Sequence, residues 1–426
     1  MPHDIAAPVP FPGLNYLLYL DFSILAFFIL LAPGFVIRPK PHAGKFAPTA
    51  GALLILMTIV FALLDFRITN LTSGLRAGLE TCLVYALPFM ALIRFVRTRE
   101  DVERVLTALI FVAIIFFFAA LISQATRWNF YTYVTNRFGY SSFADFRHGL
   151  LRVSVTVNTV LAGFIMTLGL LSVEYYRARR NLDFIRAMLA RGMCVMAAFF
   201  TYSRGAWLGM AVAYATYFLF AKMPRAVRAP IVLFGVFIVS PIAFNIASTA
   251  DLNAIDEFGS FEYRQELLRT SMAYIRMHPI FGDPNFRESG FFDHLYQGQG
   301  IIDVVNTYIN IALRYGLVGL SLFVGVFGVS IFGLRMAGDL MPNRERSDLD
   351  LRRAVLGAAN AGYLAILATT SSVSLFTHVG TFLIAISVAF VAAARAEKHR
   401  ERTAPEADAA QGASLRPADA PGDLYG

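Results

Sequence analysis

Arginine within apolar sequence is the first feature of this chain that could do chemistry. Arg204 lies between Ser203 and Gly205, inside a hydrophobic run at 192–221. An arginine at the centre of a bilayer costs about 2.5 to 3.5 kcal/mol on insertion scales, so such residues usually face a polar cavity. The small neighbours Ser203 and Gly205 permit two short helices to meet at a turn there. The alternative is that Arg204 lies at a membrane interface and extends its charge into water.

A second arginine lies in the longest polar interval of the chain, Ser248 to Asp303. The first half of this interval is predicted to be helical, from Ser260 as a possible N-cap to a stop at Pro279. On that helix Glu266 precedes Arg269 by three residues and can pair with it, whereas Arg264 has no carboxylate at helical spacing. Arg264 is therefore predicted to be free to bind an anion.

The composition indicates where these residues must be held. The chain has 426 residues, of which 57% are hydrophobic and 15% charged, and its mean hydropathy is +0.58. Repeated apolar runs of about 20 residues predict an all-α, polytopic transmembrane bundle embedded in a lipid bilayer. Cys82 and Cys194 lie in apolar segments and suggest neither a disulfide framework nor a metal site. The net charge of +8 lies mostly in short loops between spans, so topology explains it and no nucleic-acid partner is expected.

We expect about eleven spans in a single transmembrane domain at 1–395, followed by a disordered cytoplasmic tail at 396–426. The interval 248–303 is expected to be a periplasmic functional loop within that domain. Arginine-rich loops mark the cytoplasmic side and leave the amino terminus outside. The clearest expected spans are Leu14–Ile37, Phe46–Phe66, Gly78–Val96, Val105–Ala125, Val153–Val173, Pro230–Ala247, a span ending near Leu334, and two spans in 354–394 that turn near His378.

Two shorter segments flank Arg204. The stretch 192–202 would make roughly 16 Å of helix, less than the ~30 Å of hydrocarbon it would have to cross. The return segment 206–221 is also short. The turn at Arg204 is therefore expected in the outer half of the membrane, reachable from outside.

Aromatic residues are concentrated at 127–152, between two expected spans. They fit an outer interfacial belt, and also a platform on which sugar rings could stack.

Several motifs, taken in order, resemble the O-antigen ligase and Wzy-type O-antigen polymerase family of bacterial envelopes. The resemblance covers about 191–320, and span pattern alone extends it to the rest of the chain. The motifs are Ser203-Arg204-Gly205-Ala206-Trp207-Leu208, the long outer loop with Arg264, His278-Pro279-Ile280-Phe281-Gly282, Asn306-Thr307-Tyr308, and Tyr315-Gly316-Leu317-Val318-Gly319.

The resemblance implies a multi-pass enzyme of the bacterial inner membrane whose active face is periplasmic. Such enzymes are inverting glycosyltransferases with no required metal or other cofactor. They transfer a glycan from an undecaprenyl diphosphate donor to a glycan acceptor in exopolysaccharide or lipopolysaccharide biosynthesis. A flippase and a chain-length regulator are the expected partners.

The resemblance also assigns roles to particular residues. Arg204 and Arg264 would hold the diphosphate, which suits arginine because it stays charged and makes bidentate contacts to phosphate oxygens. Ser203, Gly205, Asn306 and Thr307 would contact the substrate. For Asn306 and Thr307, helix N-capping is an equal alternative.

One position departs from the family pattern. Family ligases carry a histidine immediately before the asparagine that heads the late span, and Val305 stands there in this chain. His294 or Asp303 could take the part of general base, although His294 is equally an ordinary loop histidine. His278 is expected to end the loop helix before Pro279.

The missing histidine favours a polysaccharide polymerase over an O-antigen ligase that acts on lipid A core. A lipid-linked oligosaccharide flippase and a non-catalytic scaffold are the rivals from other classes. No internal repeat of the kind common in transporters is evident, and the single long outer loop favours an enzyme built on one face.

Overall fold

The computed structural model describes most of the chain between residues 47 and 414. The described ranges are 47–68, 70–96, 98–129, 149–154, 158–179, 181–223, 260–296, 302–337, 346–370 and 374–414, with short pieces at 7–8, 19–20, 28–29 and 146–147.

Ten α-helices make up most of the described chain. They are α2 (Ala47–Asp65), α3 (Leu71–Phe95), α4 (Arg99–Thr126), α6 (Thr159–Ala178), α7 (Phe184–Phe200), α8 (Arg204–Lys222), α11 (Ser260–Met277), α12 (Thr307–Ala337), α13 (Arg346–Leu367) and α14 (Ser374–Ser414). Two single-turn 3₁₀ helices, η5 (Phe286–Glu288) and η6 (Asp293–Leu295), follow α11. Two-residue strands pair antiparallel, β1 (Ala7–Pro8) with β2 (Tyr19–Leu20) and β3 (Phe146–Arg147) with β4 (Leu150–Leu151).

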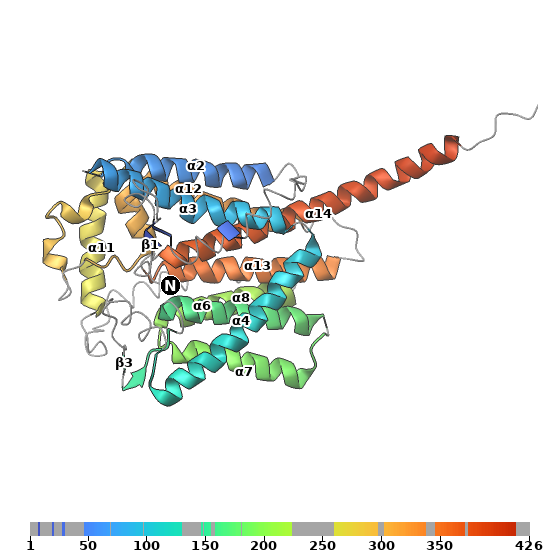
Figure 1. Ribbon diagram of the computed structural model, residues 1–426, viewed down its shortest axis with the longest axis horizontal. Helices are drawn as coiled ribbons and strands as arrows, with labels where there is room; N and C mark the ends of the chain where they lie inside the picture. The colour runs from blue at the N-terminus through green and yellow to red at the C-terminus, as the bar shows by residue number, and fades with distance from the viewer. Residues whose placement is uncertain are drawn as a thin grey trace, which may run out of the picture.

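Most of the helices form an up-and-down bundle, which α4 crosses obliquely and α11 closes at one end. Figure 1 shows α11 lying across one end of the bundle, roughly perpendicular to the other helices. We call this the α11 end; α6, α8, α12 and α14 begin there, and α7 and α13 finish there. The opposite end, where α6 finishes and α7 begins, is called the basic end.

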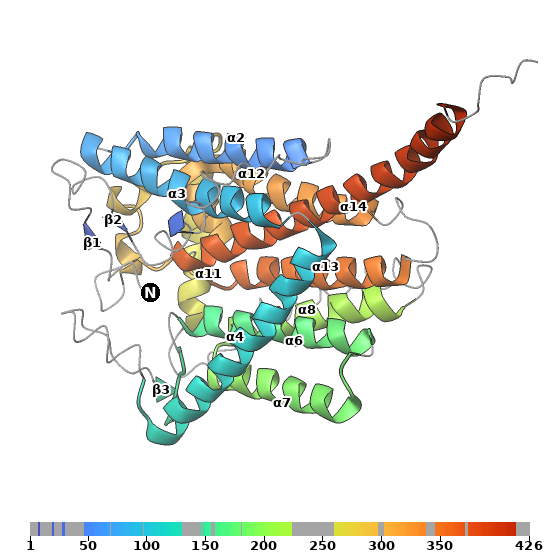
Figure 2. The same ribbon diagram turned by 45° about the vertical axis from the view of Figure 1, so that its right-hand side comes forward.

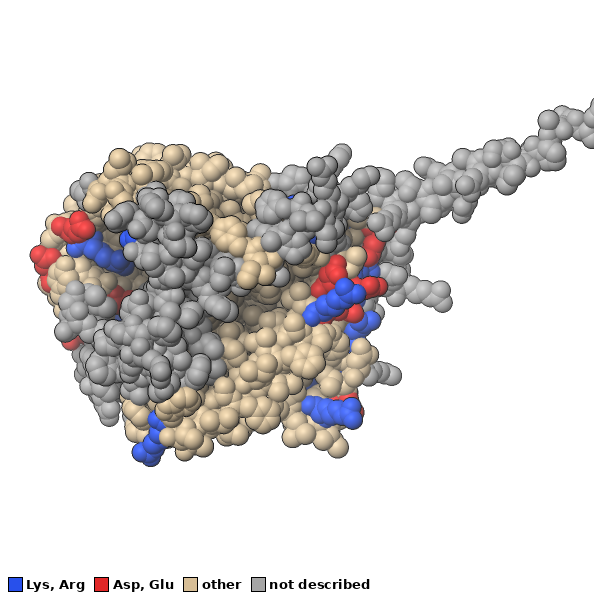
Figure 3. Space-filling model, in the orientation of Figure 1, with Lys and Arg blue, Asp and Glu red and all other residues tan. Residues whose placement is uncertain are grey.

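Length and apolar composition fit a membrane. Within the described residues, five helical stretches are long and apolar enough to cross one: Leu71–Phe95, Arg99–Thr126, Thr159–Ala178, Thr307–Ala337 and Phe376–Glu397. Charged side chains gather toward the two ends of the molecule, with a broad uncharged surface between them (Figure 3). The chain is thus a helical, multi-pass membrane protein by these criteria.

The expected number of about eleven spans is not confirmed. The expected span Pro230–Ala247 lies outside the described residues, and so does most of Leu14–Ile37. Within the latter, Tyr19 and Leu20 form β2. A short, continuously apolar run does not by itself distinguish a strand from a helix.

Partly buried ion pairs join helices at the basic end. Glu103 on α4 accepts hydrogen bonds from the Tyr175 hydroxyl at 2.5 Å and the Arg352 guanidinium at 2.5 Å, and it also pairs with Arg179. Arg352 is 5% exposed. Loss of Glu103 would leave the buried guanidinium of Arg352 without this carboxylate, so these contacts help to hold α4, α6 and α13 together.

The turn around Arg204 is where the sequence predicted it, but α7 is longer than expected. Asp183 caps α7 by accepting from the Arg186 amide at 3.1 Å, so the helix starts at Phe184 instead of Gly192. Its 17 residues span roughly 26 Å. That is close to the hydrocarbon thickness, so the argument from a short helix for a turn deep in the outer half no longer holds.

Two further boundaries differ from expectation. The chain turns between Leu367 and Ser374, and His378 lies within α14, where it is 4% exposed. The backbone of α14 is helical as far as Ser414, through much of the segment expected to be a disordered tail.

Candidate functional site

The residues Ser203, Arg204 and Gly205 join α7 to α8 at the α11 end. Ser203 is buried and precedes α8, and Arg204 is the first helical residue, with an exposed side chain. A Cβ on Gly205 would lie 2.6 Å from Thr369 Oγ1. Gly205 therefore lets the start of α8 pack directly against the end of α13, which gives this small residue a structural role.

The same end of α13 leads to the next pair of predicted site residues. Thr307 Oγ1 donates a hydrogen bond to the Thr370 carbonyl at 2.8 Å. Asn306 Oδ1 accepts from the amides of Tyr308 at 2.9 Å and Ile309 at 3.2 Å. This is the N-capping role that was one of the two alternatives for Asn306.

The adjacent threonines of the α13–α14 turn thus bring the two motifs together. Thr369 contacts Gly205, and Thr370 holds Thr307. Four predicted substrate-contact residues, far apart in sequence, gather at one place at the α11 end: Ser203, Gly205, Asn306 and Thr307.

Arg204 and Arg264 both have exposed side chains, and neither takes part in a hydrogen bond or ion pair within the described part of the chain. Arg127 and Arg276 are exposed in the same way, so it is their place in the family motifs that singles out Arg204 and Arg264. On α11, Arg269 approaches Glu266 at 3.9 Å, as the spacing predicted. Arg264 has no carboxylate partner on α11 or elsewhere among the described residues, in keeping with the spacing of its helical neighbours.

The structure does not bring His294 to the side of α11 that carries Arg264. His294 Nε2 lies 3.2 Å from Thr270 Oγ1 and 3.8 Å from Glu266 Oε1. At 100° per residue, Glu266 and Thr270 are roughly 160° and 120° around the helix from Arg264. His294 therefore sits on the opposite flank of α11.

Asp303 lies just before the start of α12 and beside α11. Its backbone carbonyl accepts a hydrogen bond from the Tyr263 hydroxyl at 3.0 Å. Its side chain is partly buried and lies near Arg287.

Arg287, which the sequence analysis did not single out, is a third cation in this region. Its guanidinium lies 5.2 Å from the centre of the Phe286 ring, on η5. Partial burial and the neighbouring charge of Arg314 hold the pKa of Arg287 below its usual range, and the Asp303 carboxylate opposes that shift. The only sequence signal was an arginine within the polar interval.

Two of the motifs that carry the family resemblance bind each other. Gly316 interrupts α12 with φ of 68° and ψ of −167°, which frees backbone groups on both sides of the break. The 278–282 segment provides hydrogen-bond partners for these groups. The Leu317 amide donates to the Pro279 carbonyl at 2.8 Å, and the Val318 amide donates to the Ile280 carbonyl at 3.2 Å. These motifs form a structural joint, which we call the kink junction.

A buried carboxylate supports the kink junction from α2. Asp65 is fully buried and forms an ion pair with Arg314, whose Nη2 lies 2.7 Å from Oδ1. It also accepts hydrogen bonds from Arg314 Nε at 2.9 Å, Tyr315 at 3.2 Å and Thr81 at 3.0 Å. The sequence placed Arg314 inside a span but gave no sign of this partner, 249 positions away.

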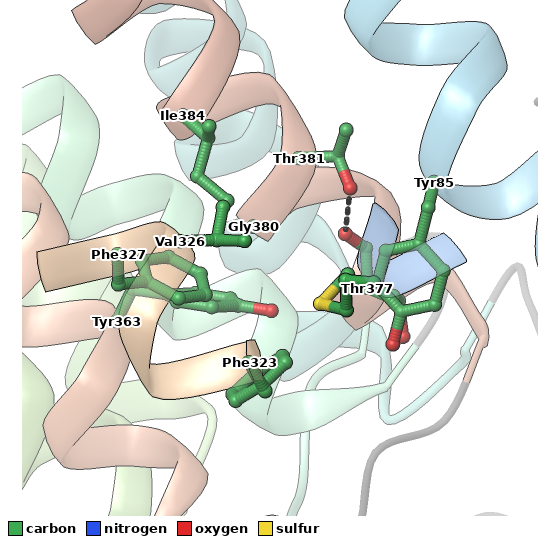
Figure 4. A pocket seen from close by; sticks show the side chains of 10 residues that line it. Tyr85, Phe323, Val326, Phe327, Tyr363, Thr377, Gly380, Thr381 and Ile384 are labelled. Atoms are coloured by element: carbon green, nitrogen blue, oxygen red, sulfur yellow. Dashed lines mark hydrogen bonds between the residues drawn. The ribbon is translucent and has the colours of Figure 1, made fainter. Parts of the chain in front are cut away.

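A small cavity lies deeper in the bundle, lined by residues of α2, α3, α12, α13 and α14 (Figure 4). The Tyr363 hydroxyl donates to the Phe376 carbonyl at 2.7 Å, and Thr381 to the Thr377 carbonyl at 3.1 Å. Its free space of about 10 Å³ is of the size that one water requires, and it is too small for a sugar.

The fold and these residues define a multi-pass helical membrane protein whose exposed Arg204 and Arg264, at one end, have no carboxylate partner among the described residues. Residues 189–324 match the family model described as O-antigen ligase, which confirms the resemblance to the O-antigen ligase and polymerase family. The match runs from α7 into the second half of α12 and contains Arg204, Arg264 and the kink junction. No curated protein matches the chain. This match, which covers less than half of the chain, supports a glycosyltransferase-like role in polysaccharide biosynthesis.

Proposed function

We propose that this protein is a polysaccharide polymerase that extends a glycan carried on undecaprenyl diphosphate at the periplasmic face of the bacterial inner membrane. The observation that carries the proposal is the pair Arg204 and Arg264. Both belong to the segment that matches the O-antigen ligase family, both lie at the α11 end, and both lack an anionic partner among the described residues. A diphosphate would supply that partner.

The reaction is a single displacement at the anomeric carbon of the donor. An acceptor hydroxyl oxygen forms a bond to that carbon, and the bond to the diphosphate oxygen breaks with its electron pair. Arg204 and Arg264 stabilise the departing undecaprenyl diphosphate, because bidentate arginine contacts are strongest to the oxygens that gain charge. The configuration at the anomeric carbon inverts.

A general base must take the proton of the acceptor hydroxyl. Asp303 is the better candidate than His294. It lies three residues before Asn306, next to the gathered substrate-contact residues, whereas His294 lies on the flank of α11 away from Arg264.

We favour a polymerase over a ligase because Val305 stands where family ligases have a histidine. The ligase histidine expected at this position would activate an acceptor on lipid A core, and valine cannot accept a proton. An O-antigen ligase remains the second candidate because the family model itself carries that description.

The test is product length. Proteoliposomes holding the full chain would be supplied with undecaprenyl-diphosphate-linked repeat units, and products would be separated on gels. We expect a ladder from the native protein and only single repeats from Arg204→Ala and Arg264→Ala, since each loses a diphosphate contact. The matched control is Arg276→Ala, an exposed arginine of the same helix as Arg264 that should keep the ladder.

The other outcomes discriminate among the rivals. Transfer onto lipid A core without lengthening of the carrier-linked chain would identify a ligase. Movement of lipid-linked units across the bilayer without any change in length would identify a flippase. A ladder that persists in both arginine variants would remove Arg204 and Arg264 from the site.

A further inference from the structure

Arg67 follows α2 and lies outside both the family match and every motif. Its guanidinium donates hydrogen bonds to the carbonyls of Phe281 at 2.7 Å, Gly282 at 3.1 Å and Arg314 at 3.5 Å. In return, Asn285 Nδ2 donates to the Arg67 carbonyl at 3.2 Å. One side chain thus ties the α2–α3 turn to both partners of the kink junction.

Asp65, two residues earlier, holds the other side of the same junction. It is fully buried and fixes Arg314 and Tyr315, the two residues before the break at Gly316. Tyr315 also stacks on Phe61 of α2, with ring centres 3.9 Å apart. At the end of α2, Asp65 therefore binds α12, and Arg67 just beyond it binds the 281–282 segment.

The backbone leaves little freedom at this joint. Gly282 has φ of 61° and Gly316 has φ of 68°, a region that suits glycine. A Cβ on Gly282 would lie 2.5 Å from the Gly316 amide nitrogen. The Asp283 amide donates to the Leu313 carbonyl at 2.7 Å, so the two segments of the kink junction are hydrogen-bonded on both sides of Gly316.

We propose that Asp65 and Arg67 are positioning residues that anchor the kink junction and thereby set the place of α11 and Arg264. The proposal rests on the proposed function for its catalytic consequence. Arg264 stands 14 residues before His278, or roughly 20 Å along a rigid helix. A tilt of about 10° at the junction would displace Arg264 by roughly 4 Å, and a 1 Å misplacement of a catalytic group can cost about 100-fold in rate.

The first arm of the test is hydrogen exchange on the full chain in nanodiscs. In Arg67→Ala, we expect the amides of Asp283, Leu317 and Val318 to exchange at least about tenfold faster, because a local opening exposes them. The α6 amides of Leu161 and Ala162 should be unchanged. Unchanged exchange at the junction would overturn the anchoring role.

The second arm measures the position of α11 directly. Spin labels would be placed by Arg276→Cys on α11 and Ile122→Cys on α4, with Cys82→Ala and Cys194→Ala as background. Arg67→Ala should broaden or shift the distance distribution, whereas Arg269→Ala, which removes only an exposed ion pair of α11, should not. A distribution unmoved by Arg67→Ala would overturn the positioning role even if the junction amides exchange faster.

The third arm is glycan transfer. We expect Arg67→Ala and Asp65→Asn to lower it ten- to a hundredfold, while Arg276→Ala leaves it unchanged. Full transfer in a variant whose α11 has moved would overturn the link to Arg264. If the native protein transfers no glycan, the proposed function fails, and the exchange and distance arms still decide the anchoring.

Discussion

Arginine plays two distinct parts in this molecule. Arg191 meets Glu174 at 2.6 and 3.0 Å, and Arg352 and Arg179 share Glu103, so these side chains cross-link helices. Arg204 and Arg264 have no such carboxylate among the described residues. The sequence predicted the lack of a local partner for Arg264, because no carboxylate stands three or four positions away on the helix. The Asp65–Arg314 pair could not, since only the folded chain brings together residues so far apart.

Single substitutions distinguish the two candidates for the general base, Asp303 and His294. We expect Asp303→Asn to lower the transfer rate by about 10² to 10⁴, the usual contribution of a positioned acid or base. His294→Ala should change it less than about threefold, because His294 faces Thr270 and Glu266. Initial rates with saturating donor would measure both.

The same experiment can reverse the assignment. Native-like rates in Asp303→Asn, together with a large loss in His294→Ala, would make His294 the base. Thermal unfolding of both variants controls for damage to the fold.

At the scale of elements, small residues decide which helices meet. The pairing of α8 with α13 is the most extensive helix contact in the described chain, and Gly205, Gly209 and Gly362 lie in it. The sequence predicted the turn at Arg204 and the loop helix to within a few residues, because their signals are local. It did not predict that α13 would be the partner of α8, since glycine spacing alone does not name the opposing helix.

A glycine pair on α13 tests this packing. A Cβ on Gly362 would lie 2.8 Å from the Gly209 carbonyl oxygen and 2.7 Å from Ala213 Cβ, whereas a Cβ on Gly357 would meet nothing within 4 Å. Gly362→Ala should therefore destabilise the protein by about 1 to 3 kcal/mol, the usual cost of overpacking.

Gly357→Ala is the matched control and should be neutral or stabilising by up to about 1 kcal/mol, given the higher helix propensity of alanine. Unfolding in detergent, followed by circular dichroism, compares the two. Equal stability of both variants would show that α8 and α13 are not closely packed.

The whole molecule has two chemically different ends. The basic end holds the ion-pair clusters of Glu103 and Glu174, and the α11 end holds the gathered site residues. Positive-inside bias predicts that the basic end faces the cytoplasm. The arginine-rich loops of the sequence predicted this polarity. The predicted number of spans depended also on the apolar runs at 14–37 and 230–247, which lie largely outside the described residues.

Cysteine labelling in intact cells tests the polarity. In a background of Cys82→Ala and Cys194→Ala, a thiol at Arg276→Cys on α11 should react with a maleimide that does not cross the inner membrane. A thiol at Arg186→Cys, at the start of α7, should react only after permeabilisation. The reverse pattern would invert the topology and place the candidate site in the cytoplasm.

The length of α14 has a mechanical consequence. Its 41 residues make a rod of roughly 60 Å, about twice the thickness of the hydrocarbon, and Figure 2 shows it continuing past the basic end of the bundle. A helix that starts at the α11 end and crosses the bilayer still has about half its length to spare. Within the bundle α14 packs against α3 and α12, so a partner that binds the protruding half would transmit force along the helix to these two neighbours.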